Sequence, residues 1–301
     1  MEIPSWPAIR PLDIGDKPLL DSIFVRLQPR VSELTFSGLY LFRRAHDYHL
    51  TRIGDSLVLL GQGYDARRYF LPPLEGDVAG ALGVLFDDGR ELYGADEAFA
   101  AHYLTGTELE VTEDRNSFDY LYLREELATL PGNRFHKKKN RINYFATRHT
   151  FEVSIYAPHH RCGCLELLDT WNRMAEHEEN VSLDLELEAT AEAISMAEQV
   201  GLEGVVVTVG GTVKAFALGE RLNAETAVCH FEKADPFMEG LPQLVNREFS
   251  RLLFSDCRYI NREQDLGEPG LRSAKLSYHP AELVRKYRAR RIPDNTKLSS
   301  S

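Results

Sequence analysis

The chain has 301 residues, of which 43% are apolar and 10% aromatic, enough to fill the cores of about two domains. Asp and Glu total 46 against 35 Lys and Arg, which gives a net charge of −11. This charge argues against a general nucleic-acid or anionic-membrane binder, so any polyanion must meet a local basic patch. No apolar run approaches the ~20 residues of a membrane helix and no signal-peptide pattern opens the chain, so we expect a cytoplasmic protein whose four cysteines are reduced thiols.

The first half of the chain predicts helices around a meander of strands. Short apolar runs bounded by turn residues indicate strands, at residues 49–53, 56–60 and 69–71. Gly54 and Asp55 separate the first two runs and suit a tight hairpin turn. Helices are expected near residues 17–27, 76–86 and 95–103.

The second half has clearer periodicity. An alternating strand at residues 151–156 precedes a helix whose apolar residues recur every third position, at Leu165, Leu168, Trp171 and Met174. A second helix near residues 183–200 ends at Gly201, a residue that suits a helix C-cap. Gly210 and Gly211 then join two apolar runs, which predicts a hairpin, and a third strand follows at 227–233.

A helix is expected after this third strand. Pro242 fits its first turn, since the missing backbone N–H costs least there, and the helix should cover residues 243–254. A short strand at 257–260 and a polar loop lead into a helical turn that carries Arg272 and Lys275.

The two halves repeat one plan, a glycine-turn hairpin, a gap and a third strand. Gly54-Asp55 stands in the first copy where Gly210-Gly211 stands in the second. The pattern predicts an α+β protein of two similar domains, at residues 1–145 and 146–301, with the functional cleft in the second.

The helix start after Gly240 is a candidate anion site, because the free N–H groups and the dipole of a helix N-terminus favour negative charge. Acetyl-CoA enzymes of the acetyltransferase superfold place the loop Gln/Arg-x-x-Gly-x-Gly/Ala here. This chain has Phe237-Met-Glu-Gly240-Leu-Pro242 instead, in which only the central glycine remains, so acetyl-CoA binding in the usual manner is disfavoured. The alternative is a plain strand-to-helix turn.

Polar side chains crowd the loop after the 257–260 strand, at Asn261, Arg262, Glu263, Gln264 and Asp265. Glu263 or Asp265 could serve as a base for an amine or hydroxyl nucleophile, and the sequence does not choose between them. Arg272 and Lys275 lie three residues apart, so on a helix both could flank an anion or an ester carbonyl. The alternative is that they pair with Asp265 or Glu268 across the loop.

The third strand ends with Glu232 and Lys233, where a sheet often presents groups to a cleft. An ion pair at the strand edge explains these two residues almost as well. His230 alternates with Phe231 and is expected to pack.

A basic run joins the two halves, at Lys137, Lys138, Lys139 and Arg141, and the tail 285–291 is also basic. Such a run is commonly a solvated helix face, and the alternative is contact with phosphates of a tRNA-sized ligand. His159, His160, Cys162 and Cys164 lie too close in sequence to surround one tetrahedral ion easily, so no metal site is expected.

Several motifs together resemble a known family, that of the C-terminal domain of phosphatidylglycerol lysyltransferase. They are Phe231-Glu-Lys-Ala, Glu239-Gly240, Asn261-Arg-Glu-Gln-Asp-Leu-Gly267 and Gly270-Leu-Arg272-x-x-Lys275-x-x-Tyr278-x-Pro280, with a looser likeness at 36–42 and 137–140. The resemblance implies two tandem GNAT-like domains and the transfer of an aminoacyl group from a charged tRNA. It makes Arg272 and Lys275 candidate donor-site cations, with Asp265 in the same site.

The resulting hypothesis is an acyl or aminoacyl transferase with aminoacyl-tRNA as donor and an unknown amine or hydroxyl acceptor. Its expected catalytic residues are Lys275, Arg272, Asp265 and Glu263. Its expected substrate-binding residues are Glu232, Lys233, Gly240, Asn261, Arg262 and Tyr278, and tRNA would contact the basic run. Two alternatives stay open, a non-catalytic GNAT-fold module that binds a ligand or partner and an acetyl-CoA-dependent N-acetyltransferase, with acetyl-CoA less favoured as donor.

Overall fold

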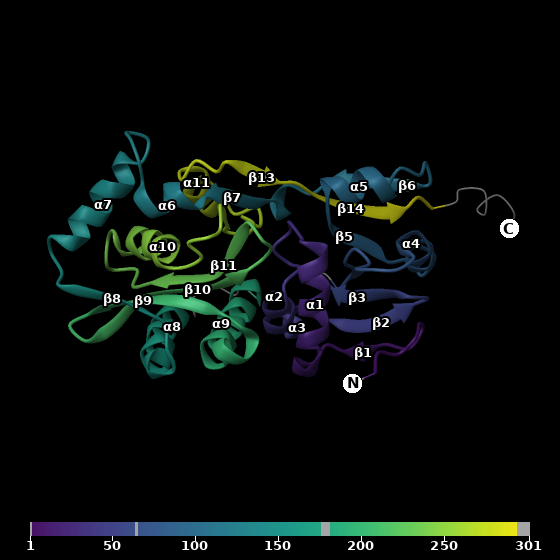
Figure 1. The fold of residues 1–301 in the computed structure, drawn as a ribbon, viewed down its shortest axis with the longest axis horizontal. Helices are drawn as coiled ribbons and strands as arrows, with labels where there is room; N and C mark the ends of the chain where they lie inside the picture. The colour runs from purple at the N-terminus through teal and green to yellow at the C-terminus, as the bar shows by residue number, and fades with distance from the viewer. Residues whose placement is uncertain (1, 64–65, 176–180, 294–301) are drawn as a thin grey trace, which may run out of the picture. The chain divides into compact units, whose positions relative to one another are not determined.

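The computed structural model describes residues 2–63, 66–175 and 181–293, and the chain forms two compact units (Figure 1). Each unit draws on distant parts of the sequence. Unit 1 comprises residues 1–27, 43–118 and 284–301, and unit 2 comprises residues 28–42 and 119–283. The units therefore differ from the consecutive halves 1–145 and 146–301 that the sequence suggested.

Unit 1 is a mixed sheet with helices. Its strands run in the spatial order β1 (Arg10–Pro11), β2 (His49–Ile53), β3 (Ser56–Gln62), β4 (Arg68–Phe70), β5 (Glu91–Asp96), β14 (Lys286–Arg291) and β6 (Leu109–Glu113). Its helices are α1 (Lys17–Leu27), α3 (Arg43–His46), α4 (Val78–Asp87) and α5 (Glu97–Tyr103), with single 3₁₀ turns at Ile14–Asp16 and Arg115–Ser117.

Unit 2 is a second mixed sheet. Its strands run in the order β13 (Glu282–Val284), β7 (Asp119–Leu123), β12 (Tyr259–Asn261), β11 (Thr226–Ala234), β10 (Thr212–Arg221), β9 (Glu203–Val209) and β8 (Phe151–Ile155). Its helices are α2 (Phe36–Leu41), α6 (Arg124–Thr129), α7 (His136–Ala146), α8 (Arg161–Ala175), α9 (Val181–Val200), α10 (Leu241–Leu252) and α11 (Pro269–Leu276), with a 3₁₀ turn at Pro158–His160.

The repeated plan is confirmed by the strand pairing. In unit 1, β2, β3 and β4 form an antiparallel meander, α4 follows, and β5 returns parallel to β4. In unit 2, β9, β10 and β11 form the same meander, α10 follows, and β12 returns parallel to β11. Both hairpin turns lie where glycine predicted them, at residues 54–55 and 210–211.

The long-range strand pairs explain why the units are not consecutive halves. The last strand of the chain, β14, pairs antiparallel with β5 of unit 1, and β7, which precedes α6, pairs antiparallel with β12 of unit 2. Each sheet is therefore completed by a strand from the other half of the sequence. Strand pairs between distant segments leave no local periodicity, so the sequence pattern did not reveal them.

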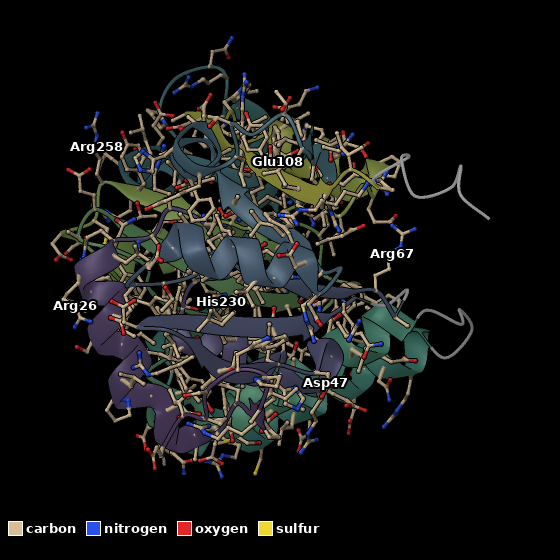
Figure 2. The ribbon with its side chains drawn as sticks, turned by 90° about the vertical axis from the view of Figure 1, so that its right-hand side faces the viewer. Arg26, Asp47, Arg67, Glu108, His230 and Arg258 are labelled. Carbon is tan, nitrogen blue, oxygen red and sulfur yellow. The ribbon has the colours of Figure 1, made fainter. Side chains whose placement is uncertain are left out.

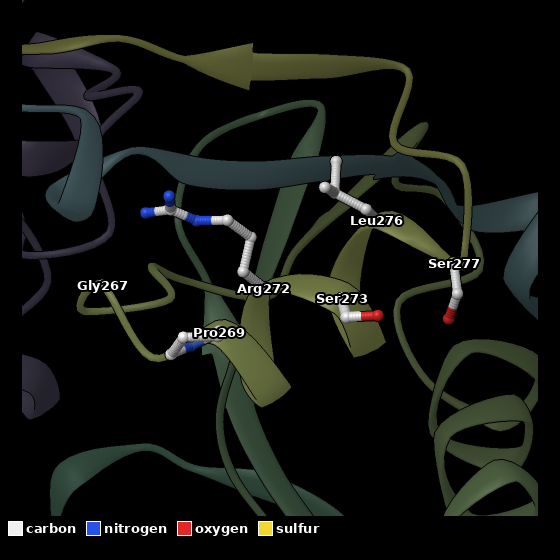
Figure 3. A pocket seen from close by; sticks show the side chains of 6 residues that line it. All are labelled: Gly267, Pro269, Arg272, Ser273, Leu276 and Ser277. Atoms are coloured by element: carbon white, nitrogen blue, oxygen red, sulfur yellow. The ribbon is translucent and has the colours of Figure 1, made fainter.

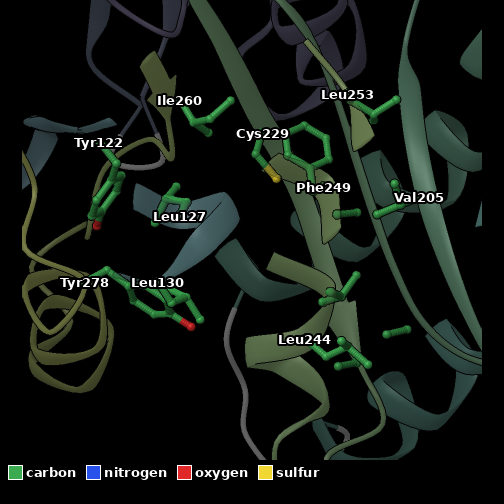
Figure 4. Packing of buried hydrophobic residues seen from close by; sticks show 14 of the residues in the cluster. Tyr122, Leu127, Leu130, Val205, Cys229, Leu244, Phe249, Leu253, Ile260 and Tyr278 are labelled. Atoms are coloured by element: carbon green, nitrogen blue, oxygen red, sulfur yellow. The ribbon is translucent and has the colours of Figure 1, made fainter. Parts of the chain in front are cut away.

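The core of unit 2 lies between its sheet and α10. The side chains of Leu244 and Phe249 on α10 belong to the same buried cluster as Val205 and Ile260 of the sheet (Figure 4). Helices α8 and α9 lie against the opposite face of the same sheet (Figure 1). Two aromatic residues of this core, Tyr122 and Tyr278, contact edge to face with ring centroids 6.4 Å apart.

Two helices predicted in unit 1 begin two residues later than expected. The helix expected from residue 76 begins at Val78, where Asp77 caps it by accepting from the Gly80 N–H. The helix expected from residue 95 begins at Glu97, because Ala95 and Asp96 still belong to β5, and Asp96 caps the helix by accepting from the Phe99 N–H.

Among residues 2–63, 66–175 and 181–293, none of the helices combines the length and the apolar composition that a bilayer crossing requires.

Candidate active site

Lys275 lies on the inner side of α11 and binds backbone. Its side chain is 8% exposed, and Nζ donates to the carbonyl oxygens of Arg262, Glu263 and Gln264, at 2.5, 3.1 and 2.6 Å. Burial first, and then the Arg262 charge, lower the pKa of Lys275 to about 8. The three donors of this ammonium group thus hold the loop that follows β12.

Arg272 and Asp265 form a bidentate pair. Arg272 Nε and Nη2 donate to the two carboxylate oxygens of Asp265 at 2.9 and 2.8 Å. Asp265 is fully buried and also accepts from the Tyr120 hydroxyl at 2.5 Å and the Gly267 N–H at 2.9 Å. Burial alone would raise the pKa of Asp265, but the hydrogen bonds from Arg272 and Tyr120 hold it well below its ordinary value. The pairing of Arg272 across the loop is the alternative that the sequence left open.

Glu263 belongs to a charged triad with His230, which is buried, and Glu220. Glu263 Oε1 lies 2.7 Å from His230 Nδ1, and Glu220 Oε1 lies 3.0 Å from His230 Nε2. The side chain of His230 is 1% exposed, whereas Arg26 and Arg258 are exposed and lie at the edge of the view in Figure 2. Burial alone would lower the pKa of His230, but the hydrogen bonds to Glu220 and Glu263 raise it to about 10. The imidazole is therefore protonated and donates to both carboxylates.

The backbone at Glu263 is held in an uncommon conformation. Its φ is 55°, in the left-handed region that residues with a side chain seldom adopt. Asn261 supports it, because Asn261 Oδ1 accepts from the Glu263 N–H at 2.7 Å and Nδ2 donates to Asp119 at 3.0 Å. Asn261 is fully buried, so it shapes the loop that carries Glu263.

Glu232 and Arg262 form the next ion pair along the sheet. Arg262 Nη2 donates to both oxygens of Glu232, at 3.2 and 3.0 Å, and Asn246 Nδ2 of α10 donates to Glu232 at 3.0 Å. The Arg262 guanidinium lies 5.0 Å from the ring centroid of Tyr278 and 5.9 Å from that of Tyr122. Cation–π contact with two aromatic rings stabilises the charge of a partly buried arginine.

Lys233 lies on the other face of the sheet from Glu232. Its Nζ donates to Glu186 of α9 at 2.7 Å and lies 5.2 Å from the Trp171 ring of α8. Successive residues of a strand point to opposite faces, so the two neighbours cannot share one cleft wall. The two residues do not pair with each other, since each forms an ion pair with a different partner, Glu232 with Arg262 and Lys233 with Glu186.

Gly240 begins α10 with a φ of 91° and is covered by α7. A Cβ built there would lie 2.0 Å from the carbonyl oxygen of Arg141, so only glycine fits. The Leu241 N–H donates to the Met238 carbonyl at 3.2 Å, and Pro242 has no N–H. This helix start therefore offers little to a pyrophosphate, which supports the plain turn and counts against acetyl-CoA bound in the usual manner.

The basic run lies in the first half of α7, in unit 2. Lys137 and Arg141 are exposed, and Lys139 Nζ donates to the Gly132 carbonyl at 3.1 Å. Lys138 is half-buried, as Lys139 is, and it differs from Lys139 in its partner, because its Nζ donates to Ser277 Oγ, just beyond α11, at 2.7 Å. The run is thus an exposed helix face with one lysine directed at α11.

An open pocket of about 540 Å³ lies on the outer side of α11, with the lining residues Gly267, Pro269, Arg272, Ser273, Leu276 and Ser277 (Figure 3). Arg272 and Ser277 lie toward opposite ends of this lining. Of the four residues expected to be catalytic, Arg272 lines the pocket, whereas Lys275, Asp265 and Glu263 support its walls or the adjoining loop. Their catalytic roles stay predictions.

Sequence reasoning missed several residues of this region. His230 was expected to pack, and Glu220, Asn246, Tyr122 and Ser277 were not singled out. Their partners come from distant segments, and no local spacing reveals such contacts. In the described parts of the chain, no cluster of three or more His, Cys, Asp or Glu side chains could hold a metal ion.

Comparison with known proteins identifies the family. Residues 24–290 match the family model described as the C-terminal part of phosphatidylglycerol lysyltransferase. The chain belongs to this family. The resemblance drawn from the motifs of the second half is thereby confirmed.

Three known proteins are similar to this chain. A conserved protein of unknown function from Bacteroides thetaiotaomicron is 31% identical, with a TM-score of 0.87 over 94% of this chain and 99% of that one. L-PGS from Bacillus licheniformis is 13% identical, with a TM-score of 0.65 over 99% of this chain and 96% of that one, so it shares the fold. An uncharacterized protein of Mycoplasmoides gallisepticum is 23% identical over 196 residues, which are 61% of this chain and 62% of that protein.

The fold class is that of the family, α+β with two tandem GNAT-like units. Family membership and the shared fold together support an aminoacyltransferase.

Proposed function

We propose that this chain transfers an aminoacyl group from aminoacyl-tRNA to an amine or hydroxyl acceptor bound at the pocket on α11. The acceptor would attack the ester carbonyl, and the ribose oxygen of the tRNA would leave. The observation that carries the proposal is the bond from Lys138 to Ser277, which joins the basic helix α7 to the pocket lining.

The pocket has the chemistry that such a donor needs. Arg272 supplies a cation at the wall, and Ser273 and Ser277 supply hydroxyl groups, while Pro269 and Leu276 give an apolar surface. Asp265 fixes the Arg272 side chain through two hydrogen bonds, so the guanidinium is preorganised for an ester carbonyl or a phosphate.

The exposed face of α7 is the proposed tRNA contact. Lys137, Lys139 and Arg141 add positive charge on one helix of a chain whose net charge is −11. Binding of tRNA by such a face depends on salt, because each phosphate contact releases condensed counterions. Aminoacyl-tRNA as the donor also agrees with the expected cytoplasmic location of the protein.

The tRNA contact is tested by a triple variant, Lys137→Gln, Lys139→Gln and Arg141→Gln, in titrations with tRNA over a range of salt concentrations. The slope of log affinity against log salt should fall by about 3, roughly one for each lost phosphate contact. Arg290→Gln is the control, because Arg290 Nε already donates to Glu110 at 2.8 Å. An unchanged slope in the triple variant would refute α7 as the tRNA surface.

Transfer itself is tested with tRNA carrying radiolabelled amino acids, with phosphatidylglycerol vesicles and glycylglycine as acceptors. The proposal expects labelled product that forms only with active protein. Tight tRNA binding without product would favour the alternative of a non-catalytic binding module.

A further inference from the structure

Transfer from an ester to an amine or hydroxyl needs a group that accepts the nucleophile's proton. The carboxylates of the candidate site are already committed to cations. Asp265 binds Arg272, Glu232 binds Arg262, and Glu263 binds the protonated His230. A carboxylate held by a buried cation is a weak base, so the proton acceptor should be sought elsewhere.

Lys138 lies where such a group is needed. Its Nζ donates to Ser277 Oγ at 2.7 Å, and Ser277 is an exposed residue of the pocket lining. The same Nζ lies 3.9 Å from the ring centroid of Tyr278, and this ring covers Nζ on one side. The carboxylate whose charge acts on Lys138 is that of Glu232, and it is already bound by Arg262.

The surroundings of Lys138 favour its neutral form. Partial burial lowers the pKa of Lys138 to about 8, and the charges of Arg262 and Arg141 act in the same direction, while the charge of Glu232 opposes them. These groups come from α7, from the end of β12 and from β11, and the end of α11 contributes the uncharged Ser277 and Tyr278. A lysine of this kind exchanges protons near neutral pH.

Lys275 has a similarly lowered pKa but cannot take the same role. Its Nζ faces the carbonyl oxygens of residues 262–264, and a carbonyl has no proton to give. Lys275 is also only 8% exposed, whereas Lys138 reaches a residue that lines the open pocket.

We propose that Lys138 is the general base of the transferase, with Ser277 and Tyr278 as the residues that position its amino group. This inference rests on the proposed function. As the acceptor nitrogen or oxygen bonds to the ester carbonyl carbon, its proton passes to Lys138 Nζ. The bond from that carbon to the ribose oxygen then breaks, and the ribose oxygen takes the proton from Lys138. The products are an aminoacylated acceptor and uncharged tRNA, and Lys138 returns to its neutral form.

The decisive variant is Lys138→Arg, which keeps the positive charge but cannot release a proton. With phosphatidylglycerol vesicles or glycylglycine as acceptor, whichever supports turnover, wild-type kcat should rise with pH, reach half of its maximum near pH 8 and level off about one pH unit higher. The variant should lose that rise, and its kcat at pH 8 should fall by about 10²-fold or more, the usual share of a general base. Binding of tRNA should change little, because the charge is retained.

Lys214→Arg is the matched control, since Lys214 pairs with Asp235 at 3.0 Å away from the pocket lining and should keep wild-type kcat. If Lys138→Arg keeps the kcat and pH profile of the wild type, Lys138 is not the base although the protein is a transferase. If the wild type itself transfers nothing to either acceptor, the proposed function fails and this role fails with it.

A second measurement does not depend on turnover. Trace acetylation of the native protein over pH 6–11, read by mass spectrometry, gives the titration midpoint of each lysine. The midpoint of Lys138 should lie near 8, well below the ordinary lysine value of 10.5. A midpoint near 10.5 would overturn the proposal, because a lysine with that pKa is charged at the pH of the reaction.

Discussion

Replacing Lys275 by Met tests whether this side chain holds the loop after β12 or acts on substrate. The substitution keeps a long apolar stem and removes three hydrogen bonds from a charged donor, each worth about 1.5–3 kcal/mol. Lys275 is only 8% exposed, so removing its charge also relieves a desolvation cost of several kcal/mol. The net loss of unfolding free energy should be about 3 kcal/mol, since three loop carbonyls lose their partner.

Thermal unfolding measures this loss directly. At about 2–4 °C for each kcal/mol in a unit of this size, the transition of Lys275→Met should fall by roughly 6–12 °C. Lys214→Met is the control, because Lys214 is partly exposed and its ion pair with Asp235 should be worth about 1 kcal/mol at most. If Lys275→Met unfolds within 1–2 °C of the wild type yet loses turnover, the donors of Lys275 serve the reaction, and the account of the loop is wrong.

Two further predictions concern packing and pH. Gly240→Ala should lower the free energy of unfolding, measured in urea, by about 3 kcal/mol, because its φ is 91° and the new Cβ would meet the Arg141 carbonyl. Gly270→Ala is the control, since its Cβ would enter open space, and it should be neutral or stabilising. Equal effects of the two variants would show that α7 does not cover Gly240. His230→Gln should be less stable than the wild type, and the difference in unfolding free energy should be largest below pH 6.5 and shrink as pH rises toward 10. The reason is that the raised pKa of His230 stabilises the fold only while the imidazole is protonated. A difference that stays constant between pH 6 and pH 10 would contradict the charged triad.

Local sequence patterns predicted those helices and strands that are determined by interactions between residues close together in the sequence. The helix at residues 17–27 and the strand at 49–53 have the expected bounds, because amphipathic spacing and glycine turns act over a few residues. The insertion of β14 and β7 depends on pairs between strands far apart in sequence, and nothing near either strand encodes its partner.

The same limit applies to the candidate site. The sequence indicated the polar loop after β12 and the cations of α11, and these residues do lie in one region of unit 2. It did not indicate that His230 binds Glu220 and Glu263, which are 10 and 33 residues away along the chain. Nor did it separate Lys138 from the other lysines of its run, because the half-buried position of Lys138 follows from the packing of α7 near the end of α11.

The central claim is that an aminoacyl group leaves tRNA for an acceptor at the pocket on α11. Single-turnover transfer of a labelled amino acid from tRNA, compared between the wild type and Arg272→Met, tests it most directly. The account predicts product with the wild type and a large loss of rate with the variant, because Arg272 lines the pocket. Equal rates in the two proteins, or no product from the wild type with any aminoacyl-tRNA, would contradict it.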